Sequence, residues 1–459
     1  MEKYQISRRR FMGSAASLLA MPTIISSGCL SKKIAKRPAA SEKINIGFIG
    51  YGTMAHDNIG NFLNNDHVQV TCVADPNRES GGYGYRSERL GGREPCRRRV
   101  NDFYAGKYSK PGWKGCSAYN DFREMIDKEN LDAVVISTPD HWHSVQAIAA
   151  ARKGLHIYGQ KPMSLCISEG QAMVREVAEA GITFQVGSQQ RSDNYFRMAC
   201  EFVRNGRIGT IKRIEMGLPG GHLMFGTTGA DASKTPMLQP PEYLDFDMWL
   251  GPAKKRPFIP AIHNPMIWRN NLDYSGGMIT DWGAHHCDIV QWALGKDASG
   301  PVLMENFKSD MPPVDAIHNT AANYSFEYVY EEGTRVFVSN KYPNGIRFVG
   351  EGGKEIFVKR GKLEMKPKNL IREKITDDEI RLYVSGQHER NFIDCIYSGK
   401  PTITTCEIGH RSITIPHLAN IALRLGRKQI RWDPVREVFI GDDEADKLKT
   451  APMRDKWSV

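Results

Sequence analysis

The residues best suited to act together chemically lie in the run from Ser275 to Asp288. The run begins with a glycine turn, is expected to open a helix, and continues into an apolar segment. Asp281, His285 and Asp288 are spaced i, i+4 and i+7, so they share one face of that helix. A carboxylate in this position can orient an imidazole for proton transfer, although two acids with one histidine can also suggest a metal site.

A lysine follows a buried strand in the first half of the chain. The apolar residues 155–159 lead directly into Gln160 and Lys161, with a proline next. Open α/β sheets bind ligands beyond the carboxyl ends of their strands, which is where this lysine would lie. Taken alone, however, a Lys-Pro pair after a strand is most simply a turn.

The clearest binding motif is a glycine-rich turn. An apolar strand over residues 43–49 runs straight into the sequence G-Y-G-T-M-A at residues 50–55, which is G-x-G-x-x-A in a strand-turn-helix context. Gly50 permits the tight turn, and Gly52 lets the backbone approach a pyrophosphate at the N-terminus of the following helix. The sequence therefore predicts a dinucleotide site.

The second strand, residues 68–74, ends at Asp75, whose carboxylate can bind ribose hydroxyls. Arg78 can instead favour a 2′-phosphate, so NAD is preferred and NADP stays open. Residues 79–116 then form a Gly-, Arg- and Tyr-rich stretch that is longer than the usual connection. It is either an insertion that clamps or covers the cofactor or a solvated surface loop.

Further strands are expected at residues 131–137 and 182–187, the first of them followed by T-P-D-H-W-H and a helix. Thr138 and Pro139 would face the cofactor at the end of the first of these strands. The second reads as the last strand of the nucleotide-binding sheet, so the domain boundary is expected near Gly187.

The combination of G-x-G-x-x-A, T-P-x-x-x-H and an E-K-P-like motif resembles the glucose-fructose oxidoreductase/inositol dehydrogenase (Gfo/Idh/MocA) family. The resemblance extends over nearly all of the chain after residue 44. It implies an α/β fold with an N-terminal Rossmann domain, residues 44–187. A C-terminal α+β substrate-binding and oligomerisation domain, residues 188–459, would be built on a largely antiparallel, open-faced sheet.

The same resemblance assigns roles to three catalytic residues. His285 would be the general base that takes the hydroxyl proton as hydride leaves the same carbon for the nicotinamide. Lys161 would stabilise the developing alkoxide, and Asp281 would hold the pair in place. Gln160 replaces the family's usual Glu, which leaves the lysine intact but alters its local charge. The Asp-x-x-x-His spacing matches this lysine-dependent arrangement, so no metal is expected.

Two sets of binding residues complete the predicted site. The cofactor-binding set is Gly50, Gly52, Thr53, Met54, Asp75, Arg78, Thr138, Pro139, His143, Gln160, Lys161 and Gln190. The substrate-binding set is Arg191, Trp268, Arg269, Tyr274 and His286. An aromatic side chain beside hydrogen-bonding ones suits a sugar, while an ordinary aromatic loop is the alternative for residues 267–274.

The N-terminus reads as an export signal. A twin-arginine motif at residues 7–13 precedes a short, weakly apolar run, so residues 1–29 are expected to be a Tat-type signal peptide and residues 30–43 a linker. Cys29 follows small residues, as at a lipoprotein processing site, and a lipid anchor there is the only membrane attachment expected. The protein would therefore be periplasmic, with that lipid as its anchor to the membrane.

Charge and cysteine usage exclude other classes. The formal net charge is +10, but residues 1–43 contribute +7 of it, so the rest of the chain is near +3 and nucleic-acid binding is not expected. Nine cysteines show no CxxC pair and no zinc spacing, so most should be buried as small apolar residues.

These observations predict an exported NAD(P)-dependent oxidoreductase that acts on a ring hydroxyl of a sugar or glycoside. No nicotinamide pool is expected outside the cytoplasm, so the cofactor should stay bound and be restored in each turnover. An NAD-dependent glycosidase that works by transient oxidation and a catalytically inactive sugar-binding protein remain alternatives. The family resemblance implies a homodimer or homotetramer.

Overall fold

The computed structural model describes residues 42–84, 89–221, 236–263, 265–313 and 315–457. The predicted signal peptide, Cys29 and nearly all of the predicted linker lie outside these residues. The described residues belong to one compact unit, and the boundary near Gly187 stays a prediction. No helix among them is long and apolar enough to cross a membrane.

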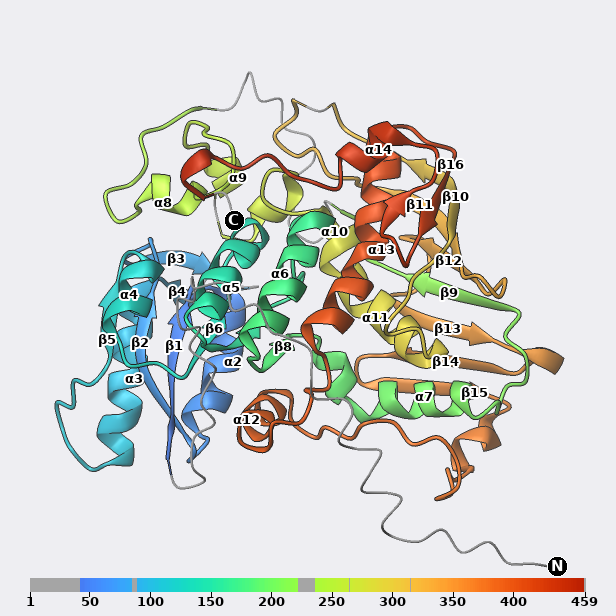
Figure 1. Cartoon of the computed structure of the whole chain (residues 1–459), viewed down its shortest axis with the longest axis horizontal. Helices are drawn as coiled ribbons and strands as arrows, with labels where there is room; N and C mark the ends of the chain where they lie inside the picture. Colours follow the sequence, from blue (N-terminus) through green and yellow to red (C-terminus); the bar gives the residue numbers. More distant parts are fainter. Residues whose placement is uncertain (1–41, 85–88, 222–235, 264, 314, 458–459) are drawn as a thin grey trace, which may run out of the picture. The chain divides into compact units, whose positions relative to one another are not determined.

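The first half of the chain forms a six-stranded parallel sheet (Figure 1). Numbered along the chain, its strands lie side by side in the order 3-2-1-4-5-6, which is the order of doubly wound sheets. Such sheets bind ligands between strands 1 and 4, where the order reverses. In spatial order the strands are β5 (Ser117–Tyr119), β2 (Val68–Ala74), β1 (Ile44–Ile49), β6 (Ala133–Ile136), β7 (His156–Gly159) and β8 (Phe184–Val186).

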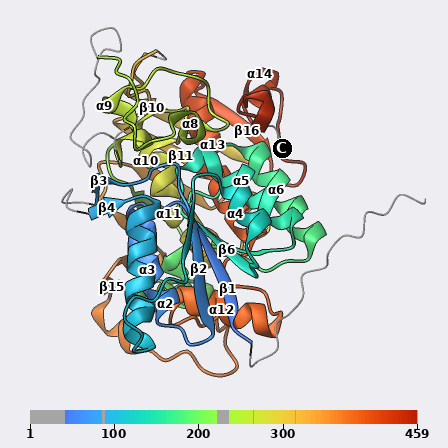
Figure 2. The same cartoon turned by 90° about the vertical axis from the view of Figure 1, so that its left-hand side faces the viewer.

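Helices cover both faces of this sheet, as Figure 2 shows for α2 and α3 on one side and α4 to α6 on the other. A helix from late in the chain, α12, shares the core of α2 and α3, with Phe392 packed in the same cluster as Phe62. The helices are α2 (Thr53–Leu63), α3 (Arg93–Lys107), α4 (Phe122–Lys128), α5 (His143–Arg152), α6 (Ile167–Ala180) and α12 (His388–Ser398).

Residues 79–116 are more regular than the expected loop. They contain the hairpin β3 (Ser80–Tyr83) and β4 (Arg89–Gly91), followed by the 15-residue helix α3. The many charged residues of α3 hide its apolar face, which is formed by Cys96, Val100 and Tyr104 at a spacing of four residues. The basic residues Arg97 and Arg98 form exposed ion pairs and do not line the pocket at the carboxyl end of the parallel sheet.

In the part of the chain that the structure describes, the second half is built on a nine-stranded sheet in which only β9 and β12 run parallel. The predicted, largely antiparallel sheet is therefore confirmed. In spatial order its strands are β15 (Lys362–Lys366), β14 (Glu355–Lys359), β13 (Gly345–Val349), β9 (Arg213–Gly217), β12 (Arg335–Ser339), β11 (Tyr324–Val329), β10 (Leu303–Ser309), β16 (Gln429–Asp433) and β17 (Val438–Phe439).

Helices cover one face of this sheet and together bury the largest apolar cluster among the described residues. The expected helix after Ser275 is interrupted at Trp282, which separates α10 from α11. The helices of this half are α7 (Asn194–Arg204), α8 (Phe246–Leu250), α9 (Pro260–His263), α10 (Gly277–Asp281), α11 (Gly283–Leu294), α13 (Cys406–Arg424) and α14 (Asp443–Lys447). The eight described cysteines are free and buried, as expected.

Candidate active site

The turn after β1 has the geometry that a dinucleotide requires. Gly50 has φ +83°, and a Cβ there would lie 2.8 Å from Thr138 Cγ2 and 3.0 Å from the Ser137 carbonyl oxygen, so only glycine fits. Helix α2 begins directly after Gly52, and no side chain among the described residues caps it. Its first N–H groups are therefore available to a phosphate, and the residues present fit a nucleotide pyrophosphate.

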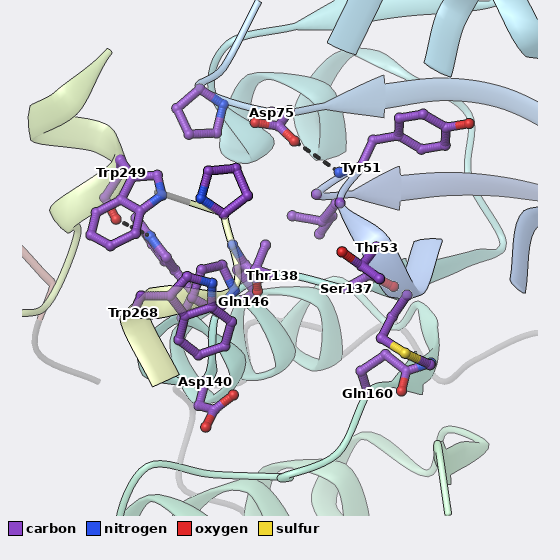
Figure 3. Close-up of a pocket in the computed structure, with 18 of the residues that line it drawn as sticks. Tyr51, Thr53, Asp75, Ser137, Thr138, Asp140, Gln146, Gln160, Trp249 and Trp268 are labelled. Atoms are coloured by element: carbon purple, nitrogen blue, oxygen red, sulfur yellow. Dashed lines mark hydrogen bonds between the residues drawn. The ribbon is translucent and has the colours of Figure 1, made fainter. Parts of the chain in front are cut away.

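A pocket with about 1000 Å³ of empty space, its open mouth included, lies at the carboxyl end of the parallel sheet (Figure 3). Asp75 lines it and accepts backbone hydrogen bonds from Tyr51 and Asn77, each at 2.8 Å. Burial raises the pKa of the Asp75 carboxyl to about 6. The predicted residues that line this pocket are Gly50, Gly52, Thr53, Met54, Asp75, Thr138, Pro139, Gln160, Lys161, Trp268 and Arg269.

Two segments from different parts of the chain close over this pocket. The ring of Tyr83, in the hairpin β3–β4, lies 3.3 Å from where a Cβ of Gly52 would be. From the second half of the chain, Met266 lines the pocket, and its Sδ accepts a hydrogen bond from Thr53 Oγ1 at 3.1 Å. The pyrophosphate turn is therefore covered by side chains of both halves.

A second pocket shares Thr53, Met54, Met266, Lys161 and Arg269 with the first, and it also contains Asp281 and His285. It lies between the parallel sheet and the helices of the second half. Three side chains that the sequence predicted to act together lie where the two pockets join: Lys161, Asp281 and His285.

Lys161 and Asp281 form a largely buried ion pair, with the lysine Nζ 2.7 Å from Asp281 Oδ1. The Nε of Arg269 lies 3.6 Å from the same carboxylate oxygen. Burial alone would raise the pKa of Asp281, but the charges of Lys161 and Arg269 outweigh it and hold the pKa below its ordinary value. Asp281 is therefore a carboxylate at neutral pH.

His285 is buried and neutral. Burial, followed by the positive charges of Lys161 and Arg360, lowers its pKa well below the ordinary value. Its Nδ1 has no hydrogen-bond partner among the described residues. A neutral imidazole on the wall of a pocket can accept a proton from a bound molecule.

The shared helix face does not give the predicted carboxylate-imidazole contact. Asp281 binds Lys161 instead of His285. The carboxylate of Asp288 accepts hydrogen bonds from Arg191 at 2.8 and 2.9 Å, inside the protein. Arg191 also binds Asp297, and it lines neither pocket. Arg191, predicted to bind substrate, is therefore placed in a buried ion-pair network.

Four other predicted residues lie away from both pocket walls. The ring of His143 bridges the carbonyl oxygens of Thr138 and Pro162, at 2.9 and 2.6 Å, and so ties the strand end after β6 to the Lys161 segment. The residues that line neither pocket are His143, Tyr274 and His286, which are buried behind the walls, and Arg78, which is exposed. Gln190 lines only the second pocket.

Several residues of the second pocket were not predicted from the sequence. Arg360, in the turn between β14 and β15, lies with its guanidinium carbon 4.8 Å from the centroid of the Trp282 ring. His388 and Glu389 enter from the start of α12. Only Trp282 had a local signal, because it lies within the run from Ser275 to Asp288. The others come from positions remote in sequence that only the tertiary fold brings together.

Two family models match the chain. The model described as "Oxidoreductase family, C-terminal alpha/beta domain" matches residues 202–459, and the model described as "Oxidoreductase family, NAD-binding Rossmann fold" matches residues 99–188. The doubly wound sheet and its glycine turn define a nucleotide-binding protein of the Rossmann class. The chain belongs to the Gfo/Idh/MocA oxidoreductase family.

Curated relatives match only part of the chain. The levoglucosan dehydrogenase of Pseudarthrobacter phenanthrenivorans is 35% identical over 194 residues, which are 42% of this chain and 40% of that protein. The alpha-N-acetylgalactosaminidase of Shewanella oneidensis is 24% identical over 227 residues, which are 45% of each protein. The matched region thus spans less than half of the length of these relatives.

The fold is also found among solved structures. The WlbA dehydrogenase from Bordetella pertussis, solved in complex with NADH and UDP-GlcNAcA, matches with a TM-score of 0.58 and 16% identity, over 86% of this chain and 99% of that chain. This likeness shows a common fold.

Proposed function

We propose that this chain is an NAD(H)- or NADP(H)-dependent oxidoreductase that oxidises a ring hydroxyl of a sugar or glycoside. The observation that carries the proposal is the Lys161–Asp281 ion pair beside the neutral imidazole of His285, where the two pockets join. The similarity to a levoglucosan dehydrogenase supports a carbohydrate substrate. Asp75 in the wall of the first pocket favours NAD over NADP.

Each side chain has a separate role in this proposal. A bound nicotinamide supplies the acceptor for the two electrons of the substrate's C–H bond. Lys161 donates a hydrogen bond from Nζ to the substrate hydroxyl and stabilises the negative charge that develops on its oxygen. His285 accepts the hydroxyl proton. Asp281 positions Lys161 by accepting a hydrogen bond from its ammonium group.

We infer that the cofactor stays bound through successive turnovers. The cover that Tyr83 and Met266 form over the pyrophosphate turn supports this inference. A retained cofactor must return to its oxidised form in each turnover. It can do so by reducing a second sugar, by re-reducing a transiently oxidised glycoside, or by passing its electrons to an external acceptor.

A glycosidase that oxidises its substrate transiently is the second candidate. The match to an alpha-N-acetylgalactosaminidase favours it. Release of free sugar without net NADH would support the glycosidase, whereas accumulation of an oxidised product would support the dehydrogenase. The convergence of Lys161, Asp281 and His285 argues against a catalytically inactive sugar-binding protein.

We also propose export through the Tat system, with Cys29 as a lipid anchor and a homodimer or homotetramer as the assembly. The twin-arginine run supports export. Fractionation of cells that express either the unmodified protein or the Arg8→Lys/Arg9→Lys variant would test export. Loss of the arginine pair should leave the variant in the cytoplasm. Light scattering of the purified protein would measure the oligomer size.

The first experiment is to purify the protein without added nucleotide, denature it, and identify any released cofactor by mass spectrometry and absorbance. Stoichiometric NAD(H) or NADP(H) is the expected result, and it would also decide between the two dinucleotides. A protein that carries none and binds neither would contradict the oxidoreductase proposal.

A further inference from the structure

A chain of hydrogen bonds runs from the start of α12 to the strand end that carries Lys161. Glu389 Oε1 accepts a hydrogen bond from Asn58 Nδ2. Asn58 Oδ1 in turn accepts one from Gln160 Nε2 at 2.7 Å. Gln160 follows β7 and directly precedes Lys161. The chain therefore connects a helix from late in the sequence with the candidate active site.

The first member of this chain is held in place. The ring of His388, which precedes Glu389, donates from Nε2 to the Val186 carbonyl oxygen at 2.8 Å. Its Nδ1 lies 2.7 Å from the hydroxyl oxygen of Ser192. Asn61 Nδ2 donates to the second carboxylate oxygen of Glu389 at 2.9 Å. The carboxylate at the start of α12 is therefore fixed relative to the parallel sheet.

This carboxylate sets the orientation of two side-chain amides. A carboxylate only accepts hydrogen bonds, so Asn58 turns its Nδ2 toward Glu389. The Oδ1 of Asn58 then faces Gln160, which must turn its own Nε2 toward it. The other end of the Gln160 amide is therefore its oxygen. Glu389 thus determines how a side chain that it does not bind directly is turned.

The oxygen of that amide is a buried acceptor. Gln160 is 3% exposed and lies in the wall of the nucleotide pocket (Figure 3). Its Oε1 has no hydrogen-bond partner among the described residues. A Cβ at Gly187 would lie 2.6 Å from Oε1, so glycine leaves room for the amide there. A buried acceptor without a partner costs free energy, which a donor on a bound ligand would recover.

We propose that Asn58 and Glu389 are positioning residues for the dinucleotide. They hold the Gln160 amide so that Oε1 accepts a hydrogen bond from the nicotinamide half of the cofactor. This rests on the oxidoreductase function proposed above, in which the nicotinamide lies beside Lys161. That half offers donors in its ribose hydroxyls and its carboxamide, and an amide turned the other way would present a second donor to them.

The test compares ligands that contain or lack the nicotinamide half. The purified full-length protein is equilibrated with radiolabelled NAD, and unlabelled NAD, ADP-ribose and ADP compete for the site. The ratio of NAD affinity to ADP affinity measures the contribution of the nicotinamide half. This ratio does not depend on how much of the protein is folded.

Glu389→Gln should lower this ratio about two- to tenfold, the range that one hydrogen bond provides. The reason is that an amide at this position can donate as well as accept, so it no longer fixes the orientation of Asn58 and Gln160. A similar fall in the ratio of ADP-ribose to ADP would identify a ribose hydroxyl as the donor. A fall for NAD alone would identify the carboxamide.

A second substitution should rescue the first. When Gln160→Glu is added to Glu389→Gln, the ratio should return, because a carboxylate at position 160 presents an oxygen whichever way it turns. Gln160→Glu alone should lower the thermal unfolding temperature, since two carboxylates then compete for the amide of Asn58. The double variant should recover that temperature. A merely structural role for Glu389 would not give this rescue of nucleotide preference.

The matched control is Tyr158→Phe. The Tyr158 hydroxyl donates to the same Glu389 oxygen at 3.3 Å, outside the chain that leads to Gln160, so its loss should leave the ratio unchanged. Asn58→Ser breaks the chain at its middle and should lower the ratio over the same range as Glu389→Gln. The test therefore does not depend on the folding of one variant.

An unchanged ratio in Glu389→Gln and Asn58→Ser, or no recovery of the ratio in the double variant, would overturn the proposal. An unmodified protein that binds no dinucleotide would instead contradict the oxidoreductase function. The two proposals can therefore fail separately.

Discussion

Lys161 Nζ and Asp281 Oδ1 lie 2.7 Å apart although 120 positions separate the two residues. The lysine follows β7 at the carboxyl end of the parallel sheet, and the aspartate ends α10 in the second half of the chain. Their ion pair joins the two halves at the place where the nucleotide pocket and the second pocket meet. Any shift between the halves would therefore break this ion pair.

The proposed base gives the first prediction. His285→Ala should lower kcat about 10²- to 10⁴-fold, the usual contribution of a positioned base. The pKa of His285 lies well below its ordinary value, so the imidazole of the unmodified protein is neutral at pH 7. The enzyme should therefore lose activity only at acid pH, where the imidazole becomes protonated. Steady-state rates from pH 4 to 9 would measure both effects.

The neighbouring His286 supplies the control for that measurement. It is buried, binds Gln190 and Asn344, and does not line the pocket, so His286→Ala should affect stability more than the pH profile. An unchanged turnover in His285→Ala would show that another group is the base.

The glycine turn gives the second prediction. Gly50→Ala should abolish retention of the dinucleotide, because its φ of +83° disfavours a side chain and the new Cβ would clash with Thr138. Gly81→Ala is the control, since its Cβ would meet nothing within 4 Å. Nucleotide content after gel filtration measures the result, and full retention by Gly50→Ala would argue against a phosphate site at this turn.

The cover over the pyrophosphate turn gives the third prediction. Tyr83→Ala should speed loss of the bound cofactor by about ten- to a hundredfold, because it removes the ring that packs over Gly52. Tyr83→Phe keeps that ring and loses only the hydroxyl that accepts a hydrogen bond from Asn77, so it should retain the cofactor nearly as well. Dissociation into excess labelled nucleotide measures the rate, and equal rates for all three proteins would exclude a retaining role.

The buried ion pair of Arg191 gives the fourth prediction. Arg191→Met should destabilise the protein by about 3–5 kcal/mol, because it leaves the carboxylate of Asp288 buried without its partner. Asp297→Asn should cost about 1 kcal/mol or less, since Asp297 is partly exposed. Urea unfolding measures both. A stable Arg191→Met protein with a raised KM would instead support a substrate-binding role.

The elements that carry a local pattern could be predicted from the sequence. Strands β1 and β2 match their expected ranges to within one residue, because buried apolar residues mark them, at alternating positions at first and then without interruption. Helix α3 was missed because charged residues dominate its sequence and its apolar stripe is narrow. A local sequence pattern therefore predicts a helix or strand only where the apolar residues at its buried positions stand out from the rest of the sequence.

The residues of the candidate active site also divide into those that have a local sequence signal and those that have none. Lys161, Asp281 and His285 were predicted because each lies in a recognisable motif. Arg360 and His388 were missed because a turn arginine and a histidine at the start of a helix have no local signal, and they reach the pocket only through the packing of the second sheet and of α12. Spacing on one helix predicted a shared face for Asp281 and Asp288, but the partner of each carboxylate was set by residues distant in sequence.

A buried carboxyl gives the last prediction, which concerns pH. Burial raises the folded-state pKa of Asp140 from its ordinary 3.8 to about 7. The protonated carboxyl therefore stabilises the fold fully below pH 3.8, and this stabilisation is lost as the pH rises through 7. Over that range the loss is about 1.4 kcal/mol per pH unit. Asp140→Asn stays neutral and can still accept the hydrogen bond from Ser275.

The variant should therefore gain stability relative to the unmodified protein between pH 5 and pH 8. Unfolding free energies in urea at both pH values measure this gain, and the other titrating groups cancel because they are common to both proteins. Asp66→Asn is the control: Asp66 is exposed, and its ion pair with Lys107 lowers the pKa, so no alkaline gain is expected there. Parallel pH dependence of Asp140→Asn and the unmodified protein would mean that the carboxyl ionises in the folded state as readily as in the unfolded one, and burial would then not govern its charge.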